Sequence, residues 1–90
     1  MLVRIPSPLR SYTEGAATVE VAQGPGVRTL GDVLHELDRR FPGLRFRVVD
    51  ERSQLRPHIR LFVDAEAVRD LSRTLEGPSE VMIVGALSGG

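Results

Sequence analysis

Short stretches of alternating apolar and polar residues predict the strands of this chain. Residues 2–5, 18–21, 58–65 and 80–84 alternate with a period of two, which is typical of strands with one buried face. Residues 67–80 alternate over too few positions for a long strand, so they predict a short edge strand or a turn. The pattern therefore indicates a small sheet with one apolar side.

One segment carries a clear helical pattern. Its apolar residues recur at spacings of three and four and form a single stripe: Leu30, Val33, Leu34, Leu37 and Phe41. Thr29 and Asp32 have the spacing of a capping box at its start, and Pro42-Gly43 is expected to stop it. These residues predict one amphipathic helix that covers one face of the sheet. Residues 44–57 predict a short helical turn followed by a charged loop.

The order of these elements predicts the fold. Strand, strand, helix, strand, short edge strand, strand is an α+β arrangement with a mixed sheet of four to five strands and one main helix across one face. This order matches the β-grasp, or ubiquitin-like, roll, in which the first and last strands lie side by side at the centre. Residues 1–84 would form the domain, and residues 85–90 would leave a central strand as a flexible tail.

Composition excludes several classes of function. The chain has no cysteine and therefore no disulfide or thiolate nucleophile. Its net charge of zero argues against binding to nucleic acid through phosphate neutralisation. No apolar run approaches the length of a signal peptide core or a membrane span, so we expect a cytoplasmic protein without membrane contact. All twelve basic residues are arginine.

The terminal stretch "GALSGG" is open to two interpretations. Small residues are common at frayed chain ends. Alternatively, Gly90 contributes a terminal carboxylate that is placed for chemistry at the end of a tether. The terminal residues alone leave both interpretations open.

Three segments together resemble the MoaD/ThiS family of ubiquitin-like sulfur carriers. They are "IPSPLRSYTEG", "TLGDVLHELDRRFPGLRFRVVDE" and "EVMIVGALSGG". The chain length and "FPGL" resemble the MoaD-like and cysteine-biosynthesis branches. Two departures stand out: Gly85-Ala86 replaces prolines that are frequent in relatives, and Asp64-Ala65 replaces a frequent Asn-Gly. Because alanine disfavours a left-handed backbone, the second departure predicts a turn of another geometry.

The resemblance implies a chemistry for the tail. An E1-like adenylyltransferase would use ATP to activate the Gly90 carboxylate, and a persulfide or sulfide donor would convert it to a thiocarboxylate. Gly89 and Gly90 would pass through a narrow channel of that enzyme, at the end of a tail formed by Gly85, Ala86, Leu87 and Ser88. Six residues reach roughly 20 Å when extended.

The resemblance also implies partners. Besides the activating enzyme, these are a sulfur-accepting synthase of the molybdopterin synthase large subunit or cysteine synthase type, and a metallohydrolase that cleaves the tail. The chain itself is expected to bind no cofactor or metal and to act as a carrier, not an enzyme.

A docking surface for these partners is expected on the sheet face away from the helix. Alternation assigns five outward residues to it: Phe62, Met82, Val84, Arg4 and Arg60. Val84 and Leu87 also match family positions that contact the activating enzyme. The alternative is that Phe62 and Met82 are half-exposed strand residues, or are covered by a loop.

Two further functions remain open at this stage. A ubiquitin-like modifier would use the activated Gly90 to form amide bonds with lysines of other proteins. An interaction module whose diglycine ending is incidental would neither carry sulfur nor modify other proteins. His35 falls on the polar side of the predicted helix and His58 begins a predicted strand, so both histidines are expected to be exposed to solvent. Neither has a second ligand at metal-binding spacing.

Overall fold

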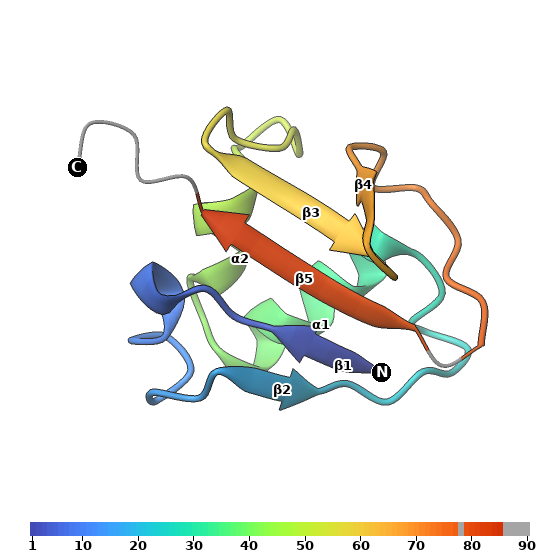
Figure 1. The fold of residues 1–90 in the computed structure, drawn as a ribbon, viewed down its shortest axis with the longest axis horizontal. Coiled ribbons are helices and arrows are strands. Elements are labelled where there is room, and N and C mark those ends of the chain that lie inside the picture. The colour runs from blue at the N-terminus through green and yellow to red at the C-terminus, as the bar shows by residue number, and fades with distance from the viewer. Residues whose placement is uncertain (78, 86–90) are drawn as a thin grey trace.

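The computed structural model describes residues 1–77 and 79–85 and is built on one five-stranded sheet (Figure 1). Its strands are β1 (Leu2–Arg4), β2 (Thr18–Glu20), β3 (Ile59–Val63), β4 (Glu66–Val68) and β5 (Glu80–Gly85). The order across the sheet is β2-β1-β5-β3-β4. β1 is parallel to β5, and the remaining pairs are antiparallel. The first and last strands thus lie side by side at the centre, as predicted.

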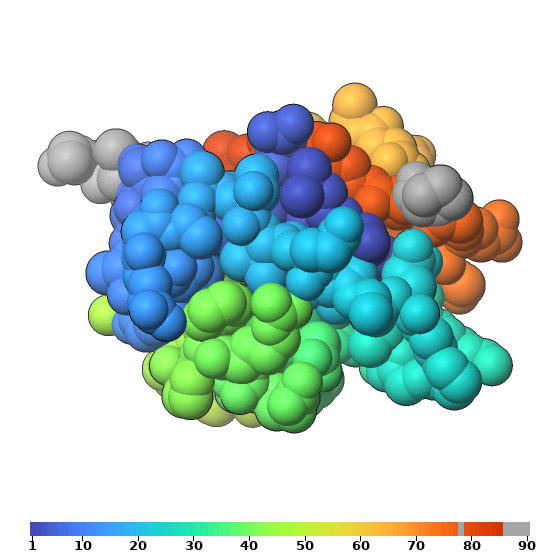
Figure 2. Space-filling model, turned by 90° about the horizontal axis from the view of Figure 1, so that it is seen from below, coloured from blue at the N-terminus to red at the C-terminus, as the bar shows by residue number. Residues whose placement is uncertain are grey.

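Three helical segments accompany the sheet: η1 (Ser7–Leu9), α1 (Leu30–Arg40) and α2 (Leu44–Val48). α1 crosses one face of the sheet, and α2 lies beside it near the end of β5 (Figure 1). Seen from below, the green helical residues form a layer under the strands (Figure 2). The predicted arrangement of one main helix on a mixed sheet is confirmed.

α1 begins where the sequence places a capping box. The hydroxyl of Thr29 accepts a hydrogen bond from the Asp32 backbone N–H at 3.1 Å. The Asp32 carboxylate accepts backbone N–H bonds from Thr29 and Arg28, both at 3.0 Å. These bonds favour the charged carboxylate and hold the pKa of Asp32 below its usual value. Beyond the helix, Gly43 adopts φ +96°, a left-handed backbone suited to glycine.

The core lies between α1 and the inner face of the sheet. The helical stripe buries Leu30, Val33, Leu34 and Leu37. The strands contribute alternate residues to it: Val3, Val19, Ile59, Leu61, Val63, Val81 and Ile83. α2 adds Leu44 and Val48, and Val68 and Leu75 close the β4 side. The alternation predicted for the strands is therefore confirmed.

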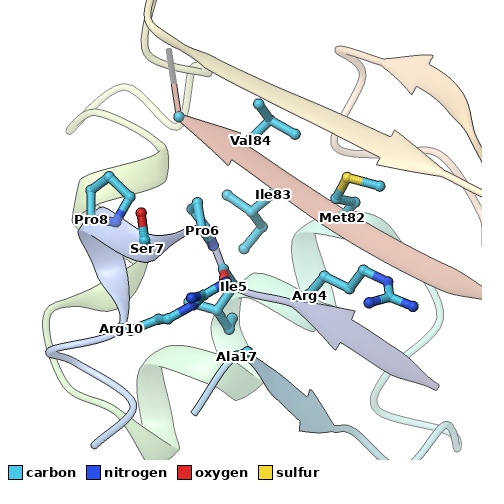
Figure 3. A pocket seen from close by; sticks show the side chains of 11 residues that line it. Arg4, Ile5, Pro6, Ser7, Pro8, Arg10, Ala17, Met82, Ile83 and Val84 are labelled. Atoms are coloured by element: carbon cyan, nitrogen blue, oxygen red, sulfur yellow. The ribbon is translucent and has the colours of Figure 1, made fainter. Parts of the chain in front are cut away.

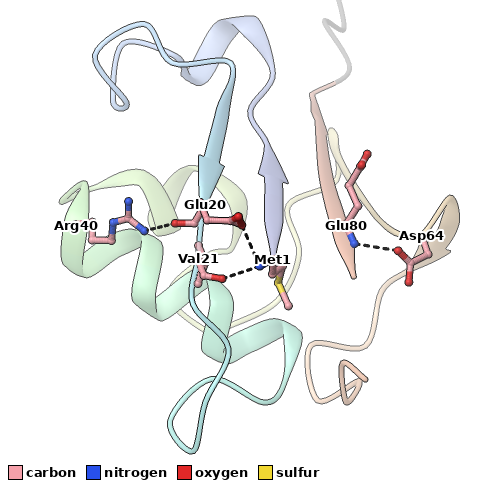
Figure 4. Close-up of polar contacts among 6 residues, drawn as sticks. All are labelled: Met1, Glu20, Val21, Arg40, Asp64 and Glu80. Atoms are coloured by element: carbon pink, nitrogen blue, oxygen red, sulfur yellow. Dashed lines mark hydrogen bonds and ion pairs between the residues drawn. The ribbon is translucent and has the colours of Figure 1, made fainter. Parts of the chain in front are cut away.

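The turn between β3 and β4 corrects one prediction. Asp64 and Ala65 have φ values of 50° and 72°, so both central residues of this two-residue hairpin are left-handed, as a type I′ turn requires. The expectation of another geometry was wrong. Two hydrogen bonds offset the backbone strain. Asp64 N–H donates to the Glu80 carbonyl at 2.9 Å, and Glu80 N–H donates to Asp64 Oδ1 at 2.9 Å (Figure 4).

Polar contacts also tie the opposite edge of the sheet to the helix. The Arg40 guanidinium in the last turn of α1 donates to the Glu20 carbonyl on β2 at 2.7 Å (Figure 4). The Met1 amine donates to the Val21 carbonyl at 2.9 Å and lies 3.0 Å from a carboxylate oxygen of Glu20.

Within the described residues, no helix has the length and hydropathy needed to cross a membrane.

Candidate functional site: the open face of the sheet

The five residues predicted to form a docking surface lie together on the sheet face opposite α1. Met82 on β5 stands between Arg4 on β1 and Phe62 on β3, its register partners on the two sides. One step along β5, Val84 lies opposite Arg60. We call these five residues the open face. Three neighbouring strands therefore bring together residues that are far apart in the sequence.

Exposure confirms the predicted direction of these side chains. Phe62, Met82 and Val84 are half-buried, and Arg4 and Arg60 are exposed. Leu61 and Ile83, their neighbours along the chain, are only 1% and 2% exposed. The open face thus carries an apolar centre with arginines beside it. Its role in docking remains a prediction.

The two arginines of the open face differ in their surroundings. Arg4 Nε donates to Glu80 Oε1 at 2.6 Å in a solvent-exposed ion pair. Arg60 donates to the carbonyls of Pro57 and Ile59, and no carboxylate of the described residues lies within ion-pair distance of it. Arg60 is consequently the more available cation for an acidic group of a partner. Arg4 would first have to break its ion pair with Glu80.

A groove next to the end of β5 was not predicted from the sequence. It has a volume of about 330 Å³, and Figure 3 shows it between the segment after β1 and the last residues of β5. Its lining includes Pro6, Pro8, Arg10, Met82 and Val84. The groove exists because β1 stops pairing at Arg4, opposite Met82. The prolines that follow were the available signal, since proline cannot continue a ladder.

The predicted tail is described in part. Gly85 was assigned to the flexible tail, but it is the last residue of β5 and pairs with Ile59 on β3. This boundary is a correction of one residue, which leaves 86–90 as the segment after the strand. Ala86, Leu87, Ser88, Gly89 and Gly90 lie outside the described residues, and the predicted activation site is among them.

Other candidate chemistry is not assembled by the fold. His35 on α1 and His58 before β3 are both exposed, as predicted. No group of three histidine or carboxylate side chains within residues 1–77 and 79–85 is arranged to hold a metal ion. Neither histidine therefore takes part in a metal site among these residues.

Comparison with known proteins identifies the relatives of this fold. The sequence model of the ThiS family matches residues 3–90. The chain belongs to the ThiS family. The match extends over the open face, the groove and the terminal diglycine, and it confirms the resemblance to ubiquitin-like sulfur carriers. The comparison with curated proteins gives no match.

Solved structures agree with this assignment. CysO in the BexX/CysO complex of Amycolatopsis orientalis is 30% identical with a TM-score of 0.86, covering 99% of this chain and 98% of that one. CysO of Mycobacterium tuberculosis is 28% identical with a TM-score of 0.83, covering 96% and 98%. SAMP1 of Haloferax volcanii is 29% identical with a TM-score of 0.82, covering 100% and 98%. The β-grasp fold is confirmed over the whole length of these ThiS-type relatives.

Proposed function

We propose that this ThiS-family protein is a sulfur carrier that becomes reactive at the carboxylate of Gly90. A carboxylate is a poor electrophile, so an E1-like enzyme must first activate it with ATP. Membership in a family of ubiquitin-like sulfur carriers is the observation that carries this proposal. The chain needs no catalytic group of its own, because the partner enzyme supplies the catalysis.

The proposed reaction has two steps. In the first, a carboxylate oxygen of Gly90 attacks the α-phosphorus of ATP, and pyrophosphate leaves. In the second, hydrosulfide attacks the acyl carbon, AMP leaves, and the carboxylate has become a thiocarboxylate. A persulfide donor would displace AMP to give an acyl disulfide instead. A thiol must then cleave its S–S bond, forming a disulfide with the donor's sulfur and releasing the thiocarboxylate.

The position of β5 supports delivery of this group to a partner. Gly85 ends a central strand beside the groove, so the chain continues from the edge of the open face. Residues 86–90 reach at most about 17 Å, somewhat less than expected when Gly85 was counted with them. Because Gly89 and Gly90 lack Cβ atoms, they suit passage through a narrow channel. The partner must therefore bind close to Gly85.

The open face is the proposed docking surface for this partner. Phe62, Met82 and Val84 would contribute apolar contact at its centre, and Arg60 would pair with a carboxylate at its rim. A relative, CysO, is known in a complex with BexX, which supports binding of a partner protein by this fold. The sulfur acceptor would be a synthase of the molybdopterin or cysteine type, and a metallohydrolase could trim the tail.

A second candidate function is that of a protein modifier. SAMP1, a small archaeal modifier protein, covers the same length with 29% identity. A modifier would transfer the activated Gly90 carbonyl to a lysine amine of another protein. Since this chain contains no lysine, no side-chain amine could extend such a conjugate into a chain. An interaction module without activation of Gly90 is the remaining alternative.

Mass spectrometry of the intact protein tests the proposal. After incubation with ATP, the E1-like enzyme and sulfide, we expect the mass increase of one oxygen replaced by sulfur, at the C-terminal peptide. A variant without Gly89 and Gly90 should show no increase, and Ser88→Ala, the matched control, should show it. Adducts on lysines of other proteins would favour the modifier. If the variant without Gly89 and Gly90 still performs the protein's full function in cells, the interaction module is favoured.

A further inference from the structure

A second surface lies at the η1 and α2 side of the molecule. It consists of Tyr12, Phe46, Arg47, Arg56 and His58, and we call it the aromatic–arginine surface. Phe46 is 53% exposed and is the one large apolar side chain of this kind among residues 1–77 and 79–85. α2 buries Leu44 and Val48 in the core and turns Phe46 outward. Packing within the domain therefore does not account for an aromatic residue at this position.

Arg56 is held over the exposed ring. Its guanidinium carbon lies 4.6 Å from the centroid of Phe46, and its Nε donates to the Phe46 carbonyl at 2.7 Å. This geometry combines a cation–π contact with a hydrogen bond. The bond fixes one edge of the guanidinium and leaves its other N–H groups available. A cation is thereby kept beside an apolar surface.

A second arginine–aromatic pair stands next to the first. Arg47 Nε donates to the Tyr12 hydroxyl at 2.6 Å, and its guanidinium carbon lies 5.8 Å from the centroid of that ring. Tyr12 in turn packs against the backbone at Gly43, where an added Cβ would lie 3.1 Å from the ring. Figure 2 shows the blue segment around Tyr12 against the green residues that end α1. The pair is thus packed against the backbone that follows α1.

A hollow connects this surface to the end of the sheet. It measures about 310 Å³ and is lined by Pro8, Leu9, Ser11, Tyr12, Arg47 and His58. Pro8 also lines the groove beside the end of β5, so the two depressions adjoin. His58 directly precedes Ile59, which pairs with Gly85. One end of the aromatic–arginine surface, at His58, therefore lies near Gly85, the last described residue of β5.

The charge of this region is positive although the chain as a whole is neutral. Residues 44–60 contain five arginines and two carboxylates, against a net charge of zero for the chain. One of these carboxylates, Asp50, already accepts the backbone N–H groups of Arg52 and Gln54, and these bonds lower its pKa. No carboxylate of the described residues lies within ion-pair distance of Arg47 or Arg56.

We propose that the aromatic–arginine surface binds an acidic segment of a partner protein, with an apolar side chain of that segment on Phe46 and its carboxylates on Arg47 and Arg56. Charge complementarity selects this occupant, because two fixed guanidinium groups match carboxylates and an exposed ring matches an apolar side chain. Nucleic acid is disfavoured because the neutral chain lacks the wider basic field that phosphate binding uses. The inference does not depend on the chemistry at Gly90.

Nuclear magnetic resonance with the ¹⁵N-labelled full chain tests this inference. The probe is a short synthetic peptide of glutamate and leucine, and the control peptide replaces each glutamate by glutamine. We expect saturable shifts of the amide signals of Phe46, Arg47, Arg56 and His58 with the acidic peptide only. Phe46→Ala and Arg47→Gln should each weaken binding about fivefold or more. Both side chains are exposed, so both variants should keep the wild-type thermal midpoint.

The matched control is Arg69→Gln, which removes an exposed arginine elsewhere on the surface and should change the affinity less than about twofold. Equal binding of the glutamine peptide would overturn the proposal, because the arginines would then contribute nothing. Shifts confined to Phe62 and Met82 would also overturn it. So would tighter binding of inorganic triphosphate or a short oligonucleotide at the same residues, since the surface would then select phosphate.

Discussion

Both faces of the central strands carry apolar side chains, but these side chains differ in their surroundings. On the inner face, Leu61 and Ile83 are almost completely buried against α1. On the open face, Phe62 and Met82 are half-buried, although each directly adjoins one of these core residues in the chain. Arginines accompany the apolar residues on the open face only. The same alternating pattern therefore supplies a core on one side and a binding surface on the other.

This difference separates stability from recognition. Complete burial of an aliphatic side chain contributes about 1.5–3 kcal/mol to folding. A half-buried residue contributes less, and its remaining apolar area becomes available when a partner covers it. Residues that matter for the carrier function can thus be changed without unfolding the domain. The following substitutions test that separation, from the largest expected effect on stability to the smallest.

Leu61→Ala should destabilise the domain by about 2–5 kcal/mol, because it leaves a cavity in the core. Phe62→Ala should reduce the free energy of unfolding by only about 1 kcal/mol, since the ring is half-exposed before the change. Chemical denaturation measures both values. If Phe62→Ala cost as much as Leu61→Ala, the distinction between the two faces would be lost.

Thr29→Ala should cost about 1 kcal/mol, because it removes the hydroxyl that caps α1, the helix that covers the inner face. Thermal unfolding followed by circular dichroism measures the loss. Ser11→Ala, an exposed substitution outside α1, should stay within about 0.5 kcal/mol of the wild type. A loss at Thr29 no larger than at Ser11 would contradict the role of the cap.

The same cap should depend on pH. The backbone N–H bonds from Arg28 and Thr29 lower the pKa of Asp32 in the folded state from its ordinary value of 3.8. The contribution of its charged form is therefore present above pH 3.8 and is lost as pH falls through the lower, folded-state pKa. Asp32→Asn should remove this part of the acid dependence in denaturation curves. Glu51→Gln, in the exposed loop after α2, is the control; an Asp32→Asn curve parallel to the wild type would refute the expectation.

Arg4→Gln should have the smallest effect on stability. Its ion pair with Glu80 is solvent-exposed, and such pairs contribute about 0–1 kcal/mol. We expect a change below about 0.5 kcal/mol that disappears at high salt, in denaturation at two ionic strengths. A larger, salt-independent loss would mean that Arg4 supports the fold and is not free to serve the open face.

Much of the fold could be predicted from local pattern. Thr29 and Asp32 act over one helical turn, and the alternation around Leu61 and Ile83 needs only a period of two, so both were visible in the sequence. The strand order followed from the sequence of elements. The positions of Phe62 and Met82 on one face followed from the same alternation.

Features that depend on distant contacts could not be predicted in this way. The Asp64-Ala65 turn keeps its left-handed backbone with the help of hydrogen bonds to Glu80, sixteen residues further along the chain. The groove exists because β1 ends early while β5 continues to Gly85. The exposure of Phe46 depends on how α2 packs against the core. Tertiary structure decides each of these features.

The most direct test of the account compares conversion of Gly90 in the wild type and in Phe62→Asp. Both proteins are incubated with the E1-like enzyme, ATP and sulfide, and the mass of the C-terminal peptide is followed with time; Ala22→Asp, at an exposed position after β2, controls for added charge. We predict that Phe62→Asp stays folded but gains sulfur far more slowly than the other two proteins. Conversion of folded Phe62→Asp at the wild-type rate would contradict the claim that the open face receives the activating partner.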